Sequence, residues 1–317
     1  MNGAVIYNGP SKLDGKPIVG IVTGMKGNSS NPKTGGIAQL WVLREDIHPA
    51  EALQTGEDES ICGGCVHRGQ VDENGETDGN TCYVRLMGPI SIWNAYHRGS
   101  YPTLTPREVS DLLASRDVEL RLGAYGDPVA LPVPVLRGLC HSVTGWTGYT
   151  HQWRKAHRSY RRWLMASTDS IAETDLARSN GWRTFRIRLP GELPIAGEID
   201  CPASPESGHR LQCQTCMICN GCGPNDTPGR VSVSIVAHGV GTGIIERRNQ
   251  YPQPVHRWPI GRRWAVFLSA WTVGRFLTSE RASATNPVPI GEFDDEDDNI
   301  CASDYDRSNH LWERFNR

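Results

Sequence analysis

The sequence predicts an α/β protein whose core is built from repeated βα units around a parallel sheet. Three observations support this fold class. Apolar segments of strand length alternate with helical segments in units of roughly 25–35 residues. Polar residues recur where the strands end, and cysteines gather in two clusters in the loops. Because the carboxyl ends of parallel strands line the active sites of α/β enzymes, the polar residues also point to catalysis.

The expected strands are 17–23, 37–43, 118–122, 163–167, 182–189 and 230–238, with a short strand end at 148–151. The expected helices are 90–97, 106–115, 132–142, 158–162 and 171–180. The first two strands flank a turn rich in Gly, Asn, Ser and Pro, which predicts a hairpin. Thr105, Pro106 and Glu108 form a good helix start, and Gly181 is well placed to end the last helix. Residues 44–82 are polar and are predicted to form a loop.

Composition and charge exclude several classes of protein. A net charge of −2 and a pI of about 6.6 argue against a general, charge-driven nucleic-acid binder. The N-terminus lacks a basic segment followed by an apolar run, and no window has the apolar length of a membrane span. We therefore expect a cytosolic protein without a membrane partner. In a reducing cytosol, clustered cysteines favour metal or redox chemistry over disulfides.

Two regions are expected from the change in composition along the 317 residues. Residues 1–244 form the α/β metal-binding core. Residues 245–317 form an irregular C-terminal extension that contains the acidic run Asp294–Asp298. The extension either wraps the core or meets a partner, and the acidic run can equally be a solvated loop.

The first cysteine set consists of Cys62, Cys65 and Cys82. Three thiolates leave one coordination position free. In a [4Fe–4S] cluster, one iron would then be open to a small molecule. In a zinc site, the free position would hold water or a fourth ligand such as His67 or Cys140.

The second run of cysteines is Cys213, Cys216, Cys219 and Cys222, with Cys201 a short way upstream. The C-x-x-C-x-x-C spacing is typical of bacterial ferredoxins, whereas zinc usually takes two separated C-x-x-C pairs. Either Cys201 or Cys222 can complete a four-ligand site. The sequence therefore predicts one or two [4Fe–4S] clusters, with zinc as the alternative.

Five residues follow the predicted strands and are expected to face a catalytic pocket: Tyr125, Asp127, His151, Asp169 and His238. Each also has a structural interpretation. Asp127 suits a turn and Asp169 suits a helix N-cap, while both histidines suit hydrogen-bonding roles.

A basic segment with interleaved aromatic residues contains Arg154, Lys155, Arg158, Arg161 and Arg162. This composition suits a nucleic-acid backbone with stacked bases. An exposed basic helix face is the structural alternative, and the near-neutral net charge of the chain favours it.

An ordered series of motifs extends over residues 17–240: Gly20 to Gly35, Cys62 to Tyr83, Arg121 to Pro128, Gly148 to Trp153, Ala166 to Ser170, Cys201 to Cys219 and Ala237 to Gly239. This series resembles a family of uncharacterised cysteine-rich proteins encoded by bacteriophages and by phage-like regions of bacterial genomes. It is similar, more distantly, to the mycobacteriophage gene product 88 proteins. The resemblance implies a phage origin and a place in the host cytoplasm.

The first cysteine set, followed by Tyr83 and then by βα units, also looks like a remote variant of radical-SAM enzymes. Those enzymes bind a [4Fe–4S] cluster through a C-x-x-x-C-x-x-C motif, and the wide spacing before Cys82 departs from it. The likeness implies a partial or full TIM-barrel-like core, S-adenosylmethionine as a co-substrate, an electron donor, and redox or radical chemistry on a small molecule or nucleotide. The alternative function is a zinc-stabilised nucleic-acid-binding or structural phage protein.

Overall fold

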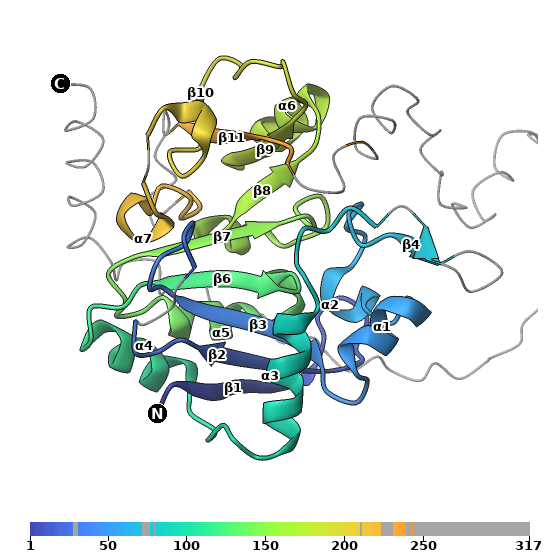
Figure 1. Ribbon diagram of the computed structural model, residues 1–317, viewed down its shortest axis with the longest axis vertical. Helices are drawn as coiled ribbons and strands as arrows, with labels where there is room; N and C mark the ends of the chain where they lie inside the picture. The colour runs from blue at the N-terminus through green and yellow to red at the C-terminus, as the bar shows by residue number, and fades with distance from the viewer. Residues whose placement is uncertain are drawn as a thin grey trace, which may run out of the picture.

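The computed structural model describes residues 1–27, 31–71, 77–78, 80–209, 211–222, 231–238 and 243. A nine-stranded sheet forms its centre, with the strand order β1-β2-β3-β6-β7-β8-β9-β11-β10 (Figure 1). The predicted extension 245–317, with its acidic run and Cys301, lies outside the described residues. Within the described part, no helix is both long and apolar enough to cross a membrane.

One edge of the sheet is antiparallel. Strands β2 (Pro17–Thr23) and β3 (Ala38–Arg44) pair antiparallel, which confirms the predicted hairpin. Strand β1 (Gly3–Pro10) pairs antiparallel with β2 at the edge, and the sequence analysis did not predict it. Strand β2 is buried continuously from Ile18 to Val22. A strand covered on both faces is apolar throughout, which made β2 easy to recognise.

The other six strands pair parallel, beginning with β3 against β6. They are β6 (Leu120–Tyr125), β7 (Trp146–Thr150), β8 (Met165–Thr168), β9 (Thr184–Arg188), β10 (Glu198–Asp200) and β11 (Ser232–Val236). This arrangement confirms an α/β fold with a mostly parallel sheet. Strands β1 and β10 are the two edges of the sheet, and no pairing among the described strands joins them.

The helices connect the strands and cover the sheet (Figure 1). They are α1 (Pro49–Thr55), α2 (Glu59–Cys62), α3 (Met87–His97), α4 (Pro106–Ala114), α5 (Val133–Leu139), α6 (Ile171–Ser179) and α7 (Cys213–Cys216). Three 3-10 helices are η1 (Pro128–Ala130), η2 (Arg158–Arg162) and η3 (Pro205–Ser207), and a small hairpin pairs β4 (Gln70–Val71) with β5 (Thr77–Asp78).

Two helix starts follow from their capping residues. At α4, the Thr105 hydroxyl accepts a hydrogen bond from the Glu108 N–H, and the Glu108 carboxylate accepts one from the Thr105 N–H. This reciprocal pair is the predicted capping box. At α6 the N-cap is Ser170, whose hydroxyl accepts from the Glu173 N–H, so the expectation that Asp169 caps this helix is wrong.

Replacing Thr105 by alanine removes one half of this capping box. We expect Thr105→Ala to lower the free energy of unfolding by about 1 kcal/mol, because the Glu108 N–H loses its acceptor. Chemical denaturation measures this difference. Ser115→Ala, at the other end of the same helix, is the control and should change stability by less than about 0.5 kcal/mol. Equal effects of the two substitutions would contradict the role of the cap.

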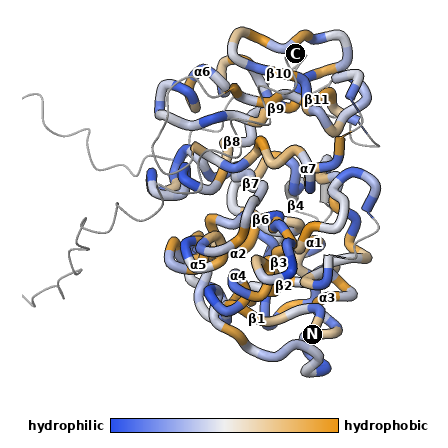
Figure 2. The backbone as a smooth tube through the Cα atoms, turned by 90° about the vertical axis from the view of Figure 1, so that its left-hand side faces the viewer, coloured by the Kyte–Doolittle hydropathy of each residue, from blue (hydrophilic) through white to orange (hydrophobic). Residues whose placement is uncertain are grey.

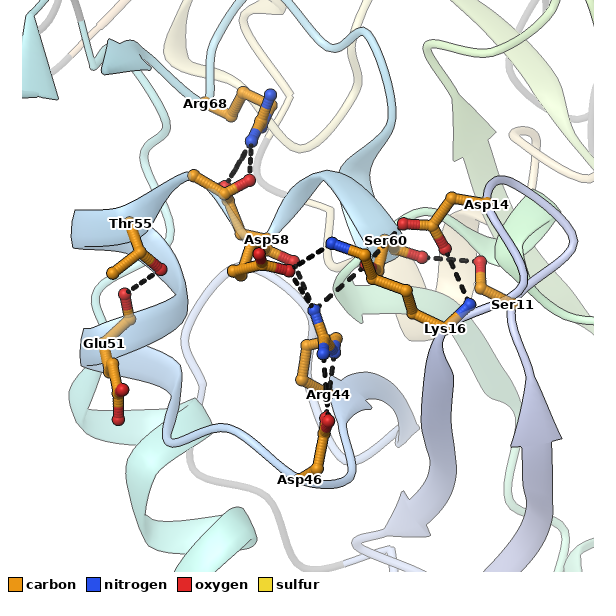
Figure 3. Close-up of polar contacts among 12 residues, drawn as sticks. Ser11, Asp14, Lys16, Arg44, Asp46, Glu51, Thr55, Asp58, Ser60 and Arg68 are labelled. Carbon is orange, nitrogen blue, oxygen red and sulfur yellow. Dashed lines mark hydrogen bonds and ion pairs between the residues drawn. The ribbon is translucent and has the colours of Figure 1, made fainter. Parts of the chain in front are cut away.

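The prediction that residues 44–82 form a loop is wrong, because this segment contains the helices α1 and α2. Few apolar residues mark these short helices, so their periodicity is weak. A polar network holds them instead (Figure 3). The buried Arg44 guanidinium donates hydrogen bonds to Asp46, Glu57 and Ser60, and Arg68 pairs with Asp58 at 2.6 Å.

Apolar side chains form two cores. The larger lies under β1, β2, β3 and β6 with α4 and α5. The smaller is built from Met165, Val233 and Ile235 together with Cys201 and Cys219, two cysteines of the second group. Figure 2 shows hydrophobic backbone in both regions, around β1 to β3 and around β9 and β11.

Candidate metal centres

The first cysteine set lies at the carboxyl end of β6. Helix α2 ends at Cys62, and the N–H of Asp127, just past β6, donates to the carbonyl of the residue before Cys62 at 2.6 Å. Cys82 joins the set because its N–H and that of its neighbour Thr81 donate to the His67 carbonyl. Each of the three thiols interacts electrostatically with the other two. The structure therefore brings the whole predicted set together.

Gln152, just after β7, clamps the turn between Cys62 and Cys65. Its Nε2 donates to the Cys62 carbonyl at 2.8 Å, and its Oε1 accepts from the Gly64 N–H at 3.2 Å. Gly63 stands between these contacts with φ 54° and ψ −140°. Side chains other than hydrogen disfavour this backbone conformation, so the turn depends on glycine here.

Burial dominates the chemistry of these thiols. It raises the pKa of Cys62 far above its usual value and that of Cys65 to about 12, and the neighbouring negative groups act in the same direction. A metal that binds here must displace the thiol protons, and its positive charge offsets the repulsion between the thiolates.

Backbone N–H groups are already aimed at several sulfurs. The N–H two positions further along the chain donates to the sulfur of Cys65, Cys82, Cys201 and Cys216. Hydrogen bonds to sulfur stabilise thiolate and tune the metal it binds. Both groups of cysteines therefore share the local geometry of metal-binding turns.

Four of the five predicted strand-end residues converge on the first cysteine set. Tyr125 ends β6 and interacts electrostatically with Cys62 and Cys82. Asp127 interacts with Cys62 and Cys65, and Asp169, just past β8, interacts with Cys65. His151 directly follows β7 and interacts with Asp169.

Asp127 organises the backbone of this region. Its carboxylate accepts hydrogen bonds from the Thr150 hydroxyl, the His151 N–H and the Val129 N–H, at 2.9–3.0 Å. Burial raises its pKa to about 6, although these hydrogen bonds act in the opposite direction. Asp127 is therefore an anchor for the loops after β6 and β7.

His67 joins the strand-end residues. Its Nε2 lies 2.9 Å from Asp169 Oδ1, its Nδ1 lies 2.7 Å from the Thr81 hydroxyl, and its ring meets that of His151 edge-on. The sequence suggested His67 only as a fourth zinc ligand. Its position two residues after Cys65 was the one available signal for a role at this site.

His238 stands apart from this group. It follows β11, is exposed, and has its Nδ1 2.9 Å from the Val236 carbonyl. Its charge interacts with Glu206, beside Cys201. The structure therefore places His238 near the other group of cysteines.

The second cysteine set consists of Cys201, Cys213, Cys216 and Cys219. Cys201 interacts electrostatically with Cys213, and Cys219 interacts with the other three. In Figure 1, α7, which carries Cys213 and Cys216, lies on the left, where β6 begins, whereas α2 lies on the right, where β6 ends. The Tyr149 hydroxyl donates a hydrogen bond to the Cys219 sulfur.

The remaining cysteines occupy other places. The Cys222 thiol contacts the Gly181 carbonyl at 3.4 Å, and its N–H donates to the Arg161 carbonyl. The structure thus assembles Cys201, rather than Cys222, with the other three. Cys140 is buried in the larger core at the end of α5. No disulfide joins any of the nine described cysteines.

Arg121 lies between the two sets. Its guanidinium donates to the hydroxyl of Tyr83, next to Cys82, and interacts electrostatically with Tyr149 and Cys213. Arg121 interacts electrostatically with Cys213 of the second set and Tyr125 with Cys62 and Cys82 of the first, and these two residues are four apart on β6. Four residues of strand span about 13 Å, so the two sets are close neighbours.

The basic segment makes many contacts within the chain. Arg154 forms an ion pair with Glu173, Arg161 donates to the Asn180 carbonyl at 3.0 Å, and Arg162 lies over a tryptophan ring. Its residues Arg158–Arg162 form η2, a 3-10 helix, where the sequence predicted a helix. Of its five Arg and Lys residues, Arg154, Lys155 and Arg158 are exposed.

No protein-family model, curated protein or solved structure matches this chain. The resemblance to the phage family therefore stays a prediction.

Proposed function

We propose that this protein is an iron–sulfur redox enzyme of phage origin that acts in the host cytoplasm. The first cysteine set would hold a [4Fe–4S] cluster with one iron open to substrate. The second cysteine set would hold a closed [4Fe–4S] cluster. The observation that carries the proposal is the convergence of three thiols with Tyr125, Asp127, His151 and Asp169 at the ends of β6, β7 and β8. Ligands at this edge of a parallel sheet typically serve catalysis.

The spacing of the sulfurs argues against a single zinc ion held by three of these thiolates. Three ligand atoms lie within 4.8 Å of one another at His67, His151 and Asp169, and no three sulfurs among the described cysteines do so. Thiolates around one tetrahedral zinc, bound at about 2.3 Å, would be roughly 3.8 Å apart. Thiolates of a [4Fe–4S] cluster bind different irons and are farther apart.

The closeness of the two sets suggests a path for electrons. The second cysteine set would hold a group able to take one electron from a reduced electron-carrier protein, and the first cysteine set would hold a group able to pass that electron on. The substrate, a small molecule or nucleotide bound at the open iron, would accept it. S-adenosylmethionine is one such substrate, as the likeness to radical-SAM enzymes implies, and the sheet would be a partial form of their barrel.

Anaerobic purification followed by iron, sulfide and zinc analysis tests the proposal. Two [4Fe–4S] clusters predict a brown protein with about eight irons and about eight sulfides per chain. A colourless protein that holds one or two zinc ions after attempted reconstitution would overturn it. That outcome would favour the zinc-stabilised alternative, in which the basic segment 154–162 binds nucleic acid and binding weakens with salt.

The position of Arg121 gives a further prediction. Its positive charge near Cys213 stabilises the reduced form of a cluster in the second set. We expect Arg121→Gln to lower the reduction potential of that cluster by on the order of 50–100 mV, at an effective dielectric constant of about 20. Redox titration followed by EPR measures the shift. Arg121→Lys keeps the charge and should shift the potential much less, and equal shifts would contradict the electrostatic explanation.

A further inference from the structure

Two histidines and an aspartate from three separate segments meet beside the first cysteine set. His67 lies in the loop between Cys65 and β4, His151 follows β7, and Asp169 follows β8. One ligand atom from each lies within 4.8 Å of the others. The separation of 2.9 Å between His67 Nε2 and Asp169 Oδ1 is close to that of two adjacent ligands bound at about 2.1 Å.

His151 supplies an independent sign that something is bound there. Its Nε2 is buried and has no hydrogen-bond partner. A buried polar atom without a partner loses its hydration and gains nothing in return, so such atoms are rare. A metal ion at this point would use the nitrogen lone pair.

An outer layer of contacts fixes the orientation of these side chains. The Thr81 hydroxyl, 2.7 Å from Nδ1 of His67, holds that ring with its Nε2 toward Asp169. Metal-binding histidines typically have such an outer partner on the second ring nitrogen. The backbone around the other two residues is also held, because the His151 N–H donates to the Asp127 carboxylate and the Asp169 N–H donates to Glu173 at 2.9 Å.

We propose that His67, His151 and Asp169 bind one divalent first-row transition-metal ion. Two imidazoles and one carboxylate suit ferrous iron and zinc, and three protein ligands leave coordination positions for water or substrate. The ion would border the first cysteine set, because Asp169 interacts electrostatically with Cys65. The site uses no cysteine, so it stands or falls separately from the proposed clusters.

Binding of Mn²⁺ to the full-length protein, after a chelator has removed any ion already held at this site, tests the proposal, with EPR as the readout. Manganese prefers nitrogen and oxygen ligands to thiolates, so it reports on this site and leaves the cysteine sets aside. We expect one Mn²⁺ per chain, with at least roughly tenfold weaker binding in His151→Ala and in Asp169→Asn. Ferrous iron and zinc should displace manganese, in keeping with their higher affinity for such sites, and metal analysis of the purified protein shows which ion is native.

His151→Ala is the cleanest variant, because the nitrogen that it removes has no hydrogen-bond partner. His238→Ala, which changes an exposed histidine elsewhere, is the matched control and should leave binding unchanged. If His151→Ala fails to fold, Thr81→Val tests the site through His67 and should weaken binding roughly tenfold. Weak binding to the acidic run Asp294–Asp298 would not respond to any of these variants. Absence of Mn²⁺ binding, or binding that His151→Ala and Thr81→Val leave unchanged, would overturn the proposal.

Discussion

Replacing Cys65 by alanine is expected to halve the iron content, from about eight to about four irons per chain, and to abolish redox activity. The first cluster depends on three protein ligands, so the loss of one leaves only two thiolates to hold it. The second cysteine set should keep its iron, because it is built from different segments at the other end of β6. Iron and sulfide analysis, with EPR of the reduced protein, measures both outcomes.

Two buried cysteines outside the sets provide matched controls for this experiment. Cys140→Ala and Cys222→Ala each remove a buried thiol and should leave the iron content unchanged. Cys201→Ala, by contrast, should remove the second cluster. If Cys222→Ala lost four irons and Cys201→Ala lost none, the assignment of the second cysteine set would be wrong. If Cys65→Ala kept all its iron, the first cluster would not exist as proposed.

The sequence predicted the parts of the fold that local patterns determine. Strand β2 matched because burial on both faces makes it continuously apolar, and α4 matched because Thr105 and Glu108 form a capping box within four residues. The edge strand β1 was missed, since its second half, Tyr7 to Pro10, alternates between partly buried and exposed residues. Helix α2 was missed because it is four residues long and is held by the distant side chain of Gln152.

The candidate site was predictable only in part. Spacing alone identified Cys62 and Cys65, whereas the pairing of His67 with Asp169 joins residues 102 positions apart. No local pattern encodes such a contact, because it follows from the adjacency of β7 and β8 and from the path of the loop that carries His67. The choice between Cys201 and Cys222 was open for the same reason. Cys201 directly follows β10, and its N–H donates to the Ser234 carbonyl of the neighbouring strand β11, far along the chain.

Gly63→Ala is expected to lower the free energy of unfolding by about 2–4 kcal/mol and to reduce occupancy of the first cluster. The substitution has two costs. At φ 54° and ψ −140° a side chain strains the backbone, and the new Cβ would lie 2.5 Å from Gln152 Oε1. Relief of the steric contact would swing the Gln152 amide away and break its hydrogen bonds to the Cys62 carbonyl and the Gly64 N–H. Chemical denaturation under anaerobic conditions, with iron analysis of the same samples, measures both effects.

Gly64→Ala is the matched control, because it is the next residue and a Cβ there meets nothing within 4 Å. We expect it to change stability by less than about 0.5 kcal/mol and to keep its iron. Comparing Gly63→Ala in the wild-type and Gln152→Ala backgrounds separates the two costs. Without the Gln152 side chain the steric contact disappears, so only the backbone strain, about 1–3 kcal/mol, should remain. Equal effects of Gly63→Ala and Gly64→Ala would show that the turn tolerates a side chain at either position, and the Gln152 clamp would then not explain how Cys62 and Cys65 are held.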